Sequence, residues 1–202
     1  ATAVMNGKPW DARFAAWLVA PLVQTPVHPN MLTTARLFVG LVGAVLLASG
    51  SAFNLGALFI VLSNFLDHTD GELARLSGKT SRFGHNYDLI SDAAVTVGLF
   101  VGLGIGLQAN LGPRSVAFGV SAGLAVAAIF HLRNLIERRH GKGATRQAKL
   151  AGFETEDVLY LIPLVTLTEQ QTTFLVAAAV GAPIAFLVVL VQFLKDGRVE
   201  DR

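Results

Sequence analysis

The chain has 202 residues, of which 52% are hydrophobic and 15% are charged, and its mean hydropathy is +0.54. A soluble domain usually carries about a quarter charged residues, so this composition indicates an integral membrane protein. We expect an all-α fold forming one domain over residues 1–202. The net charge at pH 7 is only +2, and the absence of cysteine excludes disulfides and thiolate metal sites.

The first predicted element is an amphipathic helix over about residues 11–23. Aromatic residues such as Trp17 alternate there with the charged Asp11 and Arg13. This pattern suits a helix that lies in the membrane interface. Pro29, with a second proline three residues earlier, separates this segment from the next helix.

Six apolar stretches predict six membrane spans between about residues 34 and 195. About 20 residues are needed to cross the hydrocarbon. The spans are expected at about residues 37–48, 55–76, 84–107, 116–135, 158–167 and 174–194. We expect Thr33 or Thr34 to cap the first of them. The fifth is long enough only if residues 154–157 begin it near the interface.

Basic residues gather on one side of the predicted spans. The loops after the second and fourth spans and the two termini carry Lys79, Arg82, the basic stretch over residues 133–149, Lys8, Arg13, Lys195 and Arg198. The opposite loops contribute only Arg114. Because positively charged loops tend to stay in the cytoplasm, we expect both termini to be cytoplasmic in an inner or plasma membrane. Since the basic residues follow this topology, we expect no nucleic-acid partner.

Four aspartates stand at the predicted cytoplasmic ends of the second and third spans. Asp67 and Asp70 are three residues apart, and Asp88 and Asp92 are four apart. Each pair therefore lies on one face of a helix. Two such helices packed antiparallel would bring four carboxylates together, and carboxylates are the ligands that hard divalent cations such as Mg²⁺ prefer. Acids within membrane segments are costly and are functional candidates.

Other interpretations of the acids are weaker. A structural ion pair is disfavoured because four acids, with only Arg75 and Arg82 close in sequence, would repel one another unless metal ions neutralised them. A cation transporter that uses the acids as an ion path would need them near the bilayer midplane. The small residues Gly71, Ala74 and Gly84 lie on the acidic face, where they serve helix packing or leave room for a bulky ligand such as a nucleotide.

The acids and the small residues form one continuous pattern. It reads Asp67-x-x-Asp70-Gly71-x-x-Ala74-Arg75, then eight residues, then Gly84-x-x-x-Asp88-x-x-x-Asp92. This pattern resembles the complete signature of the CDP-alcohol phosphotransferase family. The six-span layout with a preceding interfacial helix resembles that family as well.

The resemblance implies a reaction in phospholipid biosynthesis. A hydroxyl of an acceptor alcohol attacks the β-phosphoryl of a CDP-linked alcohol, for which CDP-diacylglycerol is the expected donor, and CMP is released. Two Mg²⁺ or Mn²⁺ ions would neutralise the pyrophosphate. The stretch Asp-Gly-Glu-Leu-Ala-Arg resembles members that use inositol or a polyol phosphate as the acceptor. The resemblance also implies a homodimer among membrane lipids.

The resemblance assigns roles to residues of the signature. The metal ligands are expected to be Asp67, Asp70, Asp88 and Asp92. Asp92 is also the candidate catalytic base. The nucleotide pocket is expected to be lined by Gly71, Ala74, Arg75 and Gly84.

Outside the signature, position along the chain suggests candidates for the acceptor site. These are His131, Arg133, Arg138 and Arg139. The basic stretch over residues 133–149 could bind a phosphorylated acceptor, or it could follow topology and touch anionic lipid. Glu154, Glu156 and Asp157 could hold this stretch by ion pairing or shape an acceptor pocket.

Overall fold

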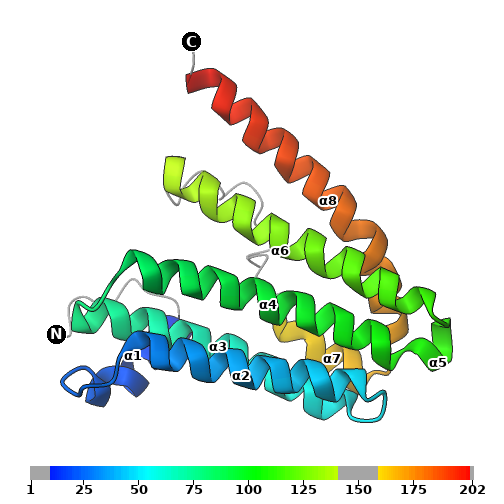
Figure 1. Ribbon diagram of the computed structural model, residues 1–202, viewed down its shortest axis with the longest axis horizontal. Coiled ribbons are helices and arrows are strands. Elements are labelled where there is room, and N and C mark those ends of the chain that lie inside the picture. Colours follow the sequence, from blue (N-terminus) through cyan, green and yellow to red (C-terminus); the bar gives the residue numbers. More distant parts are fainter. Residues whose placement is uncertain (1–9, 141–158, 201–202) are drawn as a thin grey trace.

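The computed structural model describes residues 10–140 and 159–200, with side chains over residues 14–136 and 159–195. These parts of the chain are helical, and no strand occurs in them. In chain order the elements are α1 (Trp10–Val19), the short 3-10 turn η2 (Ala20–Leu22), α2 (Pro29–Ala48), α3 (Phe53–Ser77), α4 (Arg82–Gly106), α5 (Gln108–Leu111), α6 (Arg114–His140), α7 (Ile162–Leu167) and α8 (Gln171–Glu200) (Figure 1).

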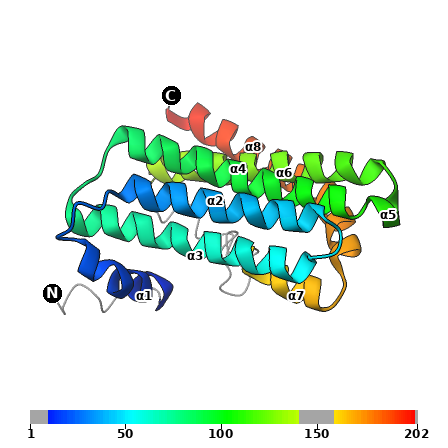
Figure 2. The ribbon, with the colours of Figure 1, turned by 60° about the horizontal axis from the view of Figure 1, so that its bottom comes forward.

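The long helices alternate in direction and lie side by side. α2 packs between α3 and α4, and α6 packs between α4 and α8 (Figures 1 and 2). α1 lies across α3 near the end where α3 joins α4 (Figure 2). It buries Ala15 and Val19 and leaves Trp17 66% exposed. That arrangement agrees with the predicted interfacial helix.

Helix ends follow local capping rules, with one departure from expectation. α2 begins at Pro29, where the missing N–H costs nothing, and the Nδ1 of His28 accepts a hydrogen bond from the Asn30 N–H at 3.3 Å. The prediction that Thr33 or Thr34 caps this helix was therefore wrong, because both residues already lie inside it. Their hydroxyls are consequently available to neighbouring helices.

Four helices are long and apolar enough to cross a membrane. They are α2, α4, α6 over Arg114–Ile136 and α8 over Gln171–Lys195. These match the first, third, fourth and sixth predicted spans. α3 has 25 residues but carries the acidic motif in its second half, and the described part of the fifth predicted span contains only the six-residue α7. The all-α membrane fold is confirmed, whereas the count of six spans is not.

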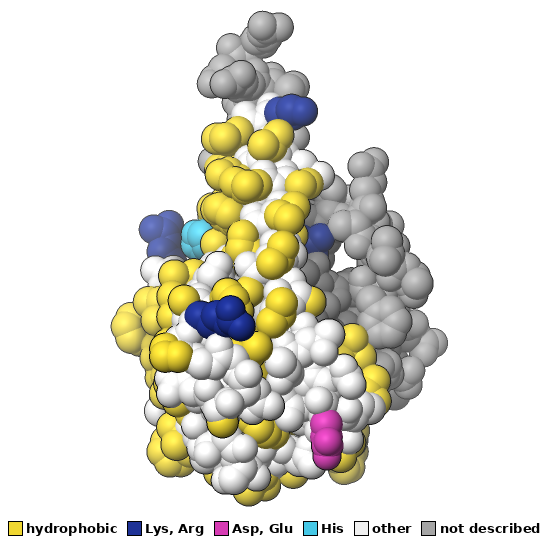
Figure 3. Space-filling model, turned by 90° about the vertical axis from the view of Figure 1, so that its right-hand side faces the viewer, with side chains coloured by type: hydrophobic (Ala, Val, Ile, Leu, Met, Phe, Trp, Pro, Cys, Tyr) yellow, Lys and Arg dark blue, Asp and Glu magenta, His cyan; other side chains and the backbone are white. Residues whose placement is uncertain are grey.

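α8 exposes most of its apolar side chains. Only 6% of its most apolar 18-residue stretch is buried. Figure 3 shows hydrophobic side chains over this helix, and they include Val180, Ile184 and Leu187. A helix that is apolar on its exposed face is suited to contact with lipid.

The bundle is tightest at the end away from the acids. A Cβ added at Gly102 would overlap the carbonyl oxygen of Ala44, and one added at Gly106 would overlap that of Leu47. A Cβ added at Gly43 would lie 3.0 Å from the carbonyl oxygen of Gly56. Small residues let membrane helices approach this closely. The α2, α3 and α4 backbones are therefore close-packed behind the acidic motif.

Candidate active site

The α3–α4 hairpin brings the four predicted acids to one end of the bundle. Asp67 and Asp70 lie on α3, and Asp88 and Asp92 lie on α4, near the connection between these antiparallel helices. One carboxylate oxygen from each of Asp67, Asp70 and Asp88 lies within 4.8 Å of the other two. Asp70 is buried and the other three are partly exposed. The two pairs thus converge as their spacing predicts.

A buried arginine on α2 stands among these acids. The side chain of Arg36 is only 2% exposed, and its Nη2 lies 3.0 Å from Asp67 Oδ1. The same nitrogen lies 2.6 Å from Asp88 Oδ1 and donates to the Asp88 carbonyl oxygen at 3.1 Å. Nη1 lies 2.7 Å from Asp92 Oδ1, and Nε lies 3.4 Å from Asp70 Oδ2. One cation therefore contacts all four carboxylates.

Sequence reasoning missed Arg36 and took Arg75 and Arg82 as the cations nearest the acids. In the structure Arg75 is 61% exposed, and its Nη1 lies 3.1 Å from the Oε1 of the buried Glu72. A signal for Arg36 was present, because it is the only charged residue over 29–66. An arginine inside an apolar membrane helix requires a polar partner.

Hydroxyl groups fix α2 against the acidic motif. Thr33 is buried, and its Oγ1 donates to Asp70 Oδ2 at 2.6 Å. Ser63 on α3 is also buried and donates to the carbonyl oxygen of Arg36 at 2.8 Å. Thr33 precedes Arg36 by about one turn, so both reach the acids from the same face of α2.

The four predicted nucleotide-pocket residues line a single cavity of about 270 Å³. These four residues are Gly71, Ala74, Arg75 and Gly84. Thr33, Asp70, Lys79 and Asp88 line the same cavity. A Cβ added at Gly71 would meet only the Arg75 side chain, at 3.4 Å. A Cβ added at Gly84 would come within 2.9 Å of Asn30 Oδ1. Gly71 therefore leaves open space, whereas Gly84 allows a close side-chain contact.

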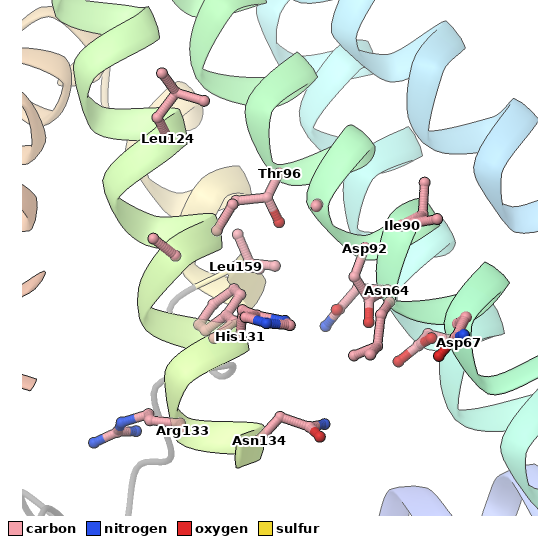
Figure 4. Close-up of a pocket in the computed structure, with 16 residues that line it drawn as sticks. Asn64, Asp67, Ile90, Asp92, Thr96, Leu124, His131, Arg133, Asn134 and Leu159 are labelled. Carbon is pink, nitrogen blue, oxygen red and sulfur yellow. The ribbon is translucent and has the colours of Figure 1, made fainter. Parts of the chain in front are cut away.

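A second cavity, of about 680 Å³, lies on the other side of the acids between α4 and α6 (Figure 4). Asp67 and Asp92 line it, and α6 contributes His131 and Arg133. In Figure 4 the His131 side chain points across the cavity toward Asp92, while the Arg133 side chain points away from it. Sequence reasoning missed further polar lining residues, which are Asn64, Asn86 and Asn134.

Several candidates from the sequence fall beyond these cavities. α6 extends over Arg138 and Arg139, but their side chains lie outside the described residues. The remainder of the basic stretch, over residues 141–149, lies outside them as well. The same holds for Glu154, Glu156 and Asp157.

The donor set fits a hard divalent cation. Asp67, Asp70 and Asp88 offer only oxygen ligands, close enough together to share an ion. Oxygen-only sets suit Mg²⁺ and Mn²⁺ and do not favour softer metals. Asp92 is outside this triad and is linked to it by the shared contact with Arg36.

Comparison with known proteins decides the family. The family model described as CDP-alcohol phosphatidyltransferase matches residues 26–193. The chain belongs to this family. The resemblance seen in the signature over residues 67–92 is thus confirmed, and the match extends over α2, α3, α4, α6 and most of α8.

Similar proteins within the family carry different names. The chain is 32% identical over 135 residues to the bifunctional IPC transferase and DIPP synthase of Rubrobacter xylanophilus, which covers 64% of this chain and 31% of that protein. It is 33% identical over 72 residues to the CDP-diacylglycerol–serine O-phosphatidyltransferase of Helicobacter pylori, covering 36% and 30% of the two chains. It is 34% identical over 108 residues to cholinephosphotransferase 1 of Danio rerio, covering 46% and 28%. The aligned part spans about a third of each relative.

Proposed function

We propose that this protein transfers a substituted phosphoryl group from a CDP-linked alcohol to the hydroxyl of an acceptor alcohol and releases CMP. The observation that carries this proposal is the position of the acids between two cavities. Asp70 and Asp88 line the cavity that contains the glycine-rich face of α3. Asp67 and Asp92 line the larger cavity toward α6. Two substrates entering from opposite sides would meet at the carboxylates.

The smaller cavity is proposed to bind the CDP group. Its open space at Gly71 admits a ligand close to the α3 backbone, and Arg75 and Lys79 place positive charge beside it. Asp70, held by Thr33, would present a fixed carboxylate to the metal site. Divalent cations, when bound by Asp67, Asp70 and Asp88, supply neutralisation of the pyrophosphate and of the departing CMP.

The larger cavity is proposed to bind the acceptor. Asp92 takes the proton from the attacking hydroxyl, a bond forms between that oxygen and the β-phosphorus, and the bond from the β-phosphorus to the CMP oxygen breaks. His131 faces Asp92 across the cavity and is suited to orient the acceptor. Asn64 and Asn134 offer amide groups to further hydroxyls. We propose inositol or a polyol phosphate as the acceptor and CDP-diacylglycerol as the donor.

The reaction is proposed to face the cytoplasm, with the protein acting as a homodimer in the membrane. Exposing lipid chains to water costs about 0.8 kcal/mol per CH₂, so the lipid would enter sideways from the inner leaflet. The connection between α3 and α4 carries Lys79 and is followed at once by Arg82, whereas Arg114 is the single basic residue among the described residues at the opposite end of the bundle. Impermeant thiol reagents added to intact cells should label Gln108→Cys, and they should label Ser81→Cys only after the membrane is permeabilised. Labelling of Ser81→Cys from outside would contradict this orientation.

The activity is tested by CMP release from the purified full chain. CDP-diacylglycerol should be offered with inositol, inositol phosphate, glycerol phosphate and serine in turn, and CDP-linked polar alcohols should be offered with diacylglycerol. We expect one pairing to release CMP and to form a phosphodiester in equal amount. No CMP release from any pairing in the presence of Mg²⁺ would contradict the proposed function.

A further inference from the structure

Arg36 occupies a place that packing alone does not explain. It is the only charged residue of α2, and its side chain is 2% exposed in the centre of the bundle. Burying a guanidinium is costly unless the charge is paired and hydrogen-bonded. Here the three guanidinium nitrogens meet four carboxylates from two other helices, at 2.6–3.4 Å.

Contacts around the backbone hold this arginine in place. Ser63 donates to the Arg36 carbonyl oxygen from α3. One turn further along α2, a Cβ at Gly40 would come within 2.7 Å of the Ser63 hydroxyl, so the two helices touch there. Thr33, one turn earlier, bonds to Asp70. The guanidinium is therefore directed at the carboxylates by an anchored backbone.

The guanidinium divides its contacts among the four carboxylates. Arg36 meets Oδ1 of Asp67, Asp88 and Asp92. It meets Oδ2 of Asp70, which also accepts the Thr33 hydroxyl. The guanidinium thus reaches one named oxygen on each of the four carboxylates. A planar fork with several donors suits such divided contacts, which a single ammonium cannot reproduce.

We propose that Arg36 is a positioning residue of the metal centre that acts as its permanent counter-ion: it holds the four carboxylates together before metal binds and keeps a positive charge beside the divalent cations afterwards. When ionised, the four carboxylates and Arg36 carry a net charge of −3. Two divalent cations would raise it to +1, which favours a pyrophosphate. This inference rests on the proposed function, but its test measures stability and metal binding rather than transfer.

Arg36→Met tests the charge. In EDTA the four carboxylates lose their shared counter-ion, and breaking such a buried pair should lower the melting temperature by about 10 °C. Mn²⁺ should recover most of this loss, since it neutralises the same carboxylates. The Mn²⁺ concentration that gives half of the thermal stabilisation should fall by about tenfold, because a positive charge beside the metal has been removed. CMP release should nevertheless be slower.

The matched control is Arg114→Met, which removes the same charge from an exposed position at the far end of the bundle. It should leave the Mn²⁺ half-point within about twofold of the unmodified protein, since its charge lies far from the metal and is screened by solvent. If Arg36 served packing alone, Arg36→Met would lower the melting temperature equally in EDTA and in Mn²⁺. An equal loss, or a Mn²⁺ half-point moved to higher concentration, overturns the proposal.

A double variant keeps the test decisive if Arg36→Met does not fold. Asp92→Asn removes one of the repelling charges, so Arg36→Met combined with Asp92→Asn should be more stable in EDTA than Arg36→Met alone. In the unmodified background, Asp92→Asn should give no such gain, because the Arg36 contact at 2.7 Å is lost. Non-additivity of this sign supports the shared counter-ion. Additive losses, or a double variant that also fails to fold, overturn it.

Discussion

The two ends of the α2–α3–α4 bundle use small residues in opposite ways. At one end, Gly102 and Gly106 press against the α2 backbone, so no side chain fits between the helices. At the other end, Gly71 faces a cavity and meets only the side chain of Arg75. The closed end fixes the spacing of the helices, and the open end uses that spacing to hold four carboxylates between two cavities. The role of a glycine in a membrane helix, close packing or room for a ligand, therefore depends on which atoms surround it.

The largest effect is expected at the open end, from Asp92→Asn. Without its base, the transfer step should slow by about 10²–10⁴-fold. The CDP ligand should still bind in Mg²⁺ with nearly unchanged affinity, because Asp92 lines the larger cavity and not the smaller one, which is proposed to bind the CDP group. Calorimetry with a CDP ligand and a CMP-release assay measure the two quantities separately.

Asp70→Asn is the contrasting variant. Asp70 lines the smaller cavity and belongs to the carboxylate triad, so both CDP binding and turnover should fall. Equal losses of CDP affinity in Asp92→Asn and Asp70→Asn would remove the assignment of Asp92 as the base.

At the closed end, Gly102→Ala should act on stability. The added methyl would overlap the Ala44 carbonyl oxygen, and overpacking of this kind costs about 1–3 kcal/mol. Gly181→Ala on α8 is the control, because nothing lies within 4 Å of its added Cβ. Thermal unfolding in detergent should show a loss for the first variant and none for the second. Equal stability of the two variants would contradict the close approach of α2 and α4.

Gly71→Ala sharpens the comparison between the ends. The new methyl meets no backbone, so the melting temperature should stay the same or rise slightly through better helix propensity. The methyl would occupy the cavity, and the dissociation constant for a CDP ligand should rise by about tenfold, or 1.4 kcal/mol. A drop in melting temperature like that of Gly102→Ala, with unchanged CDP binding, would show that Gly71 serves packing.

The smallest effect is expected from His131→Ala in the larger cavity. Loss of one hydrogen bond to the acceptor costs about 1 kcal/mol, so KM for the acceptor should rise about fivefold. CDP binding should not change, because His131 does not line the smaller cavity. Arg133→Ala is a useful comparison, since its side chain points away from Asp92 and should have less effect. If KM rose for the CDP donor instead, the proposed contact of His131 with the acceptor would be contradicted.

Much of the acidic site could be predicted from spacing. Intervals of three and four residues on two successive helices require Asp67, Asp70, Asp88 and Asp92 to converge if the helices pack as a hairpin. The contact of Arg36 with the acids could not be predicted, because these partners are more than thirty residues away along the chain. Long-range pairing of this kind depends on how helices pack, which the spacing along one helix does not reveal.

The spans show a second limit of sequence reasoning. α2 and α8 are apolar throughout, and hydropathy identifies them directly. α3 combines an apolar first half with the acidic motif, so its composition alone does not qualify it as a span. The cavities could not be predicted from the sequence either, because Asn64 and Asn134 come to line one cavity only through the packing of α3, α4 and α6.

The most direct test is the metal dependence of CMP release from the purified protein. With CDP-diacylglycerol and the accepted alcohol, Mg²⁺ or Mn²⁺ should support release, and excess EDTA should abolish it. Ca²⁺ should be a poor substitute, because it binds carboxylates with longer and looser geometry. Returning Mg²⁺ to the EDTA-treated protein should restore the rate. Undiminished CMP release in excess EDTA would contradict a metal-dependent centre built from Asp67, Asp70 and Asp88.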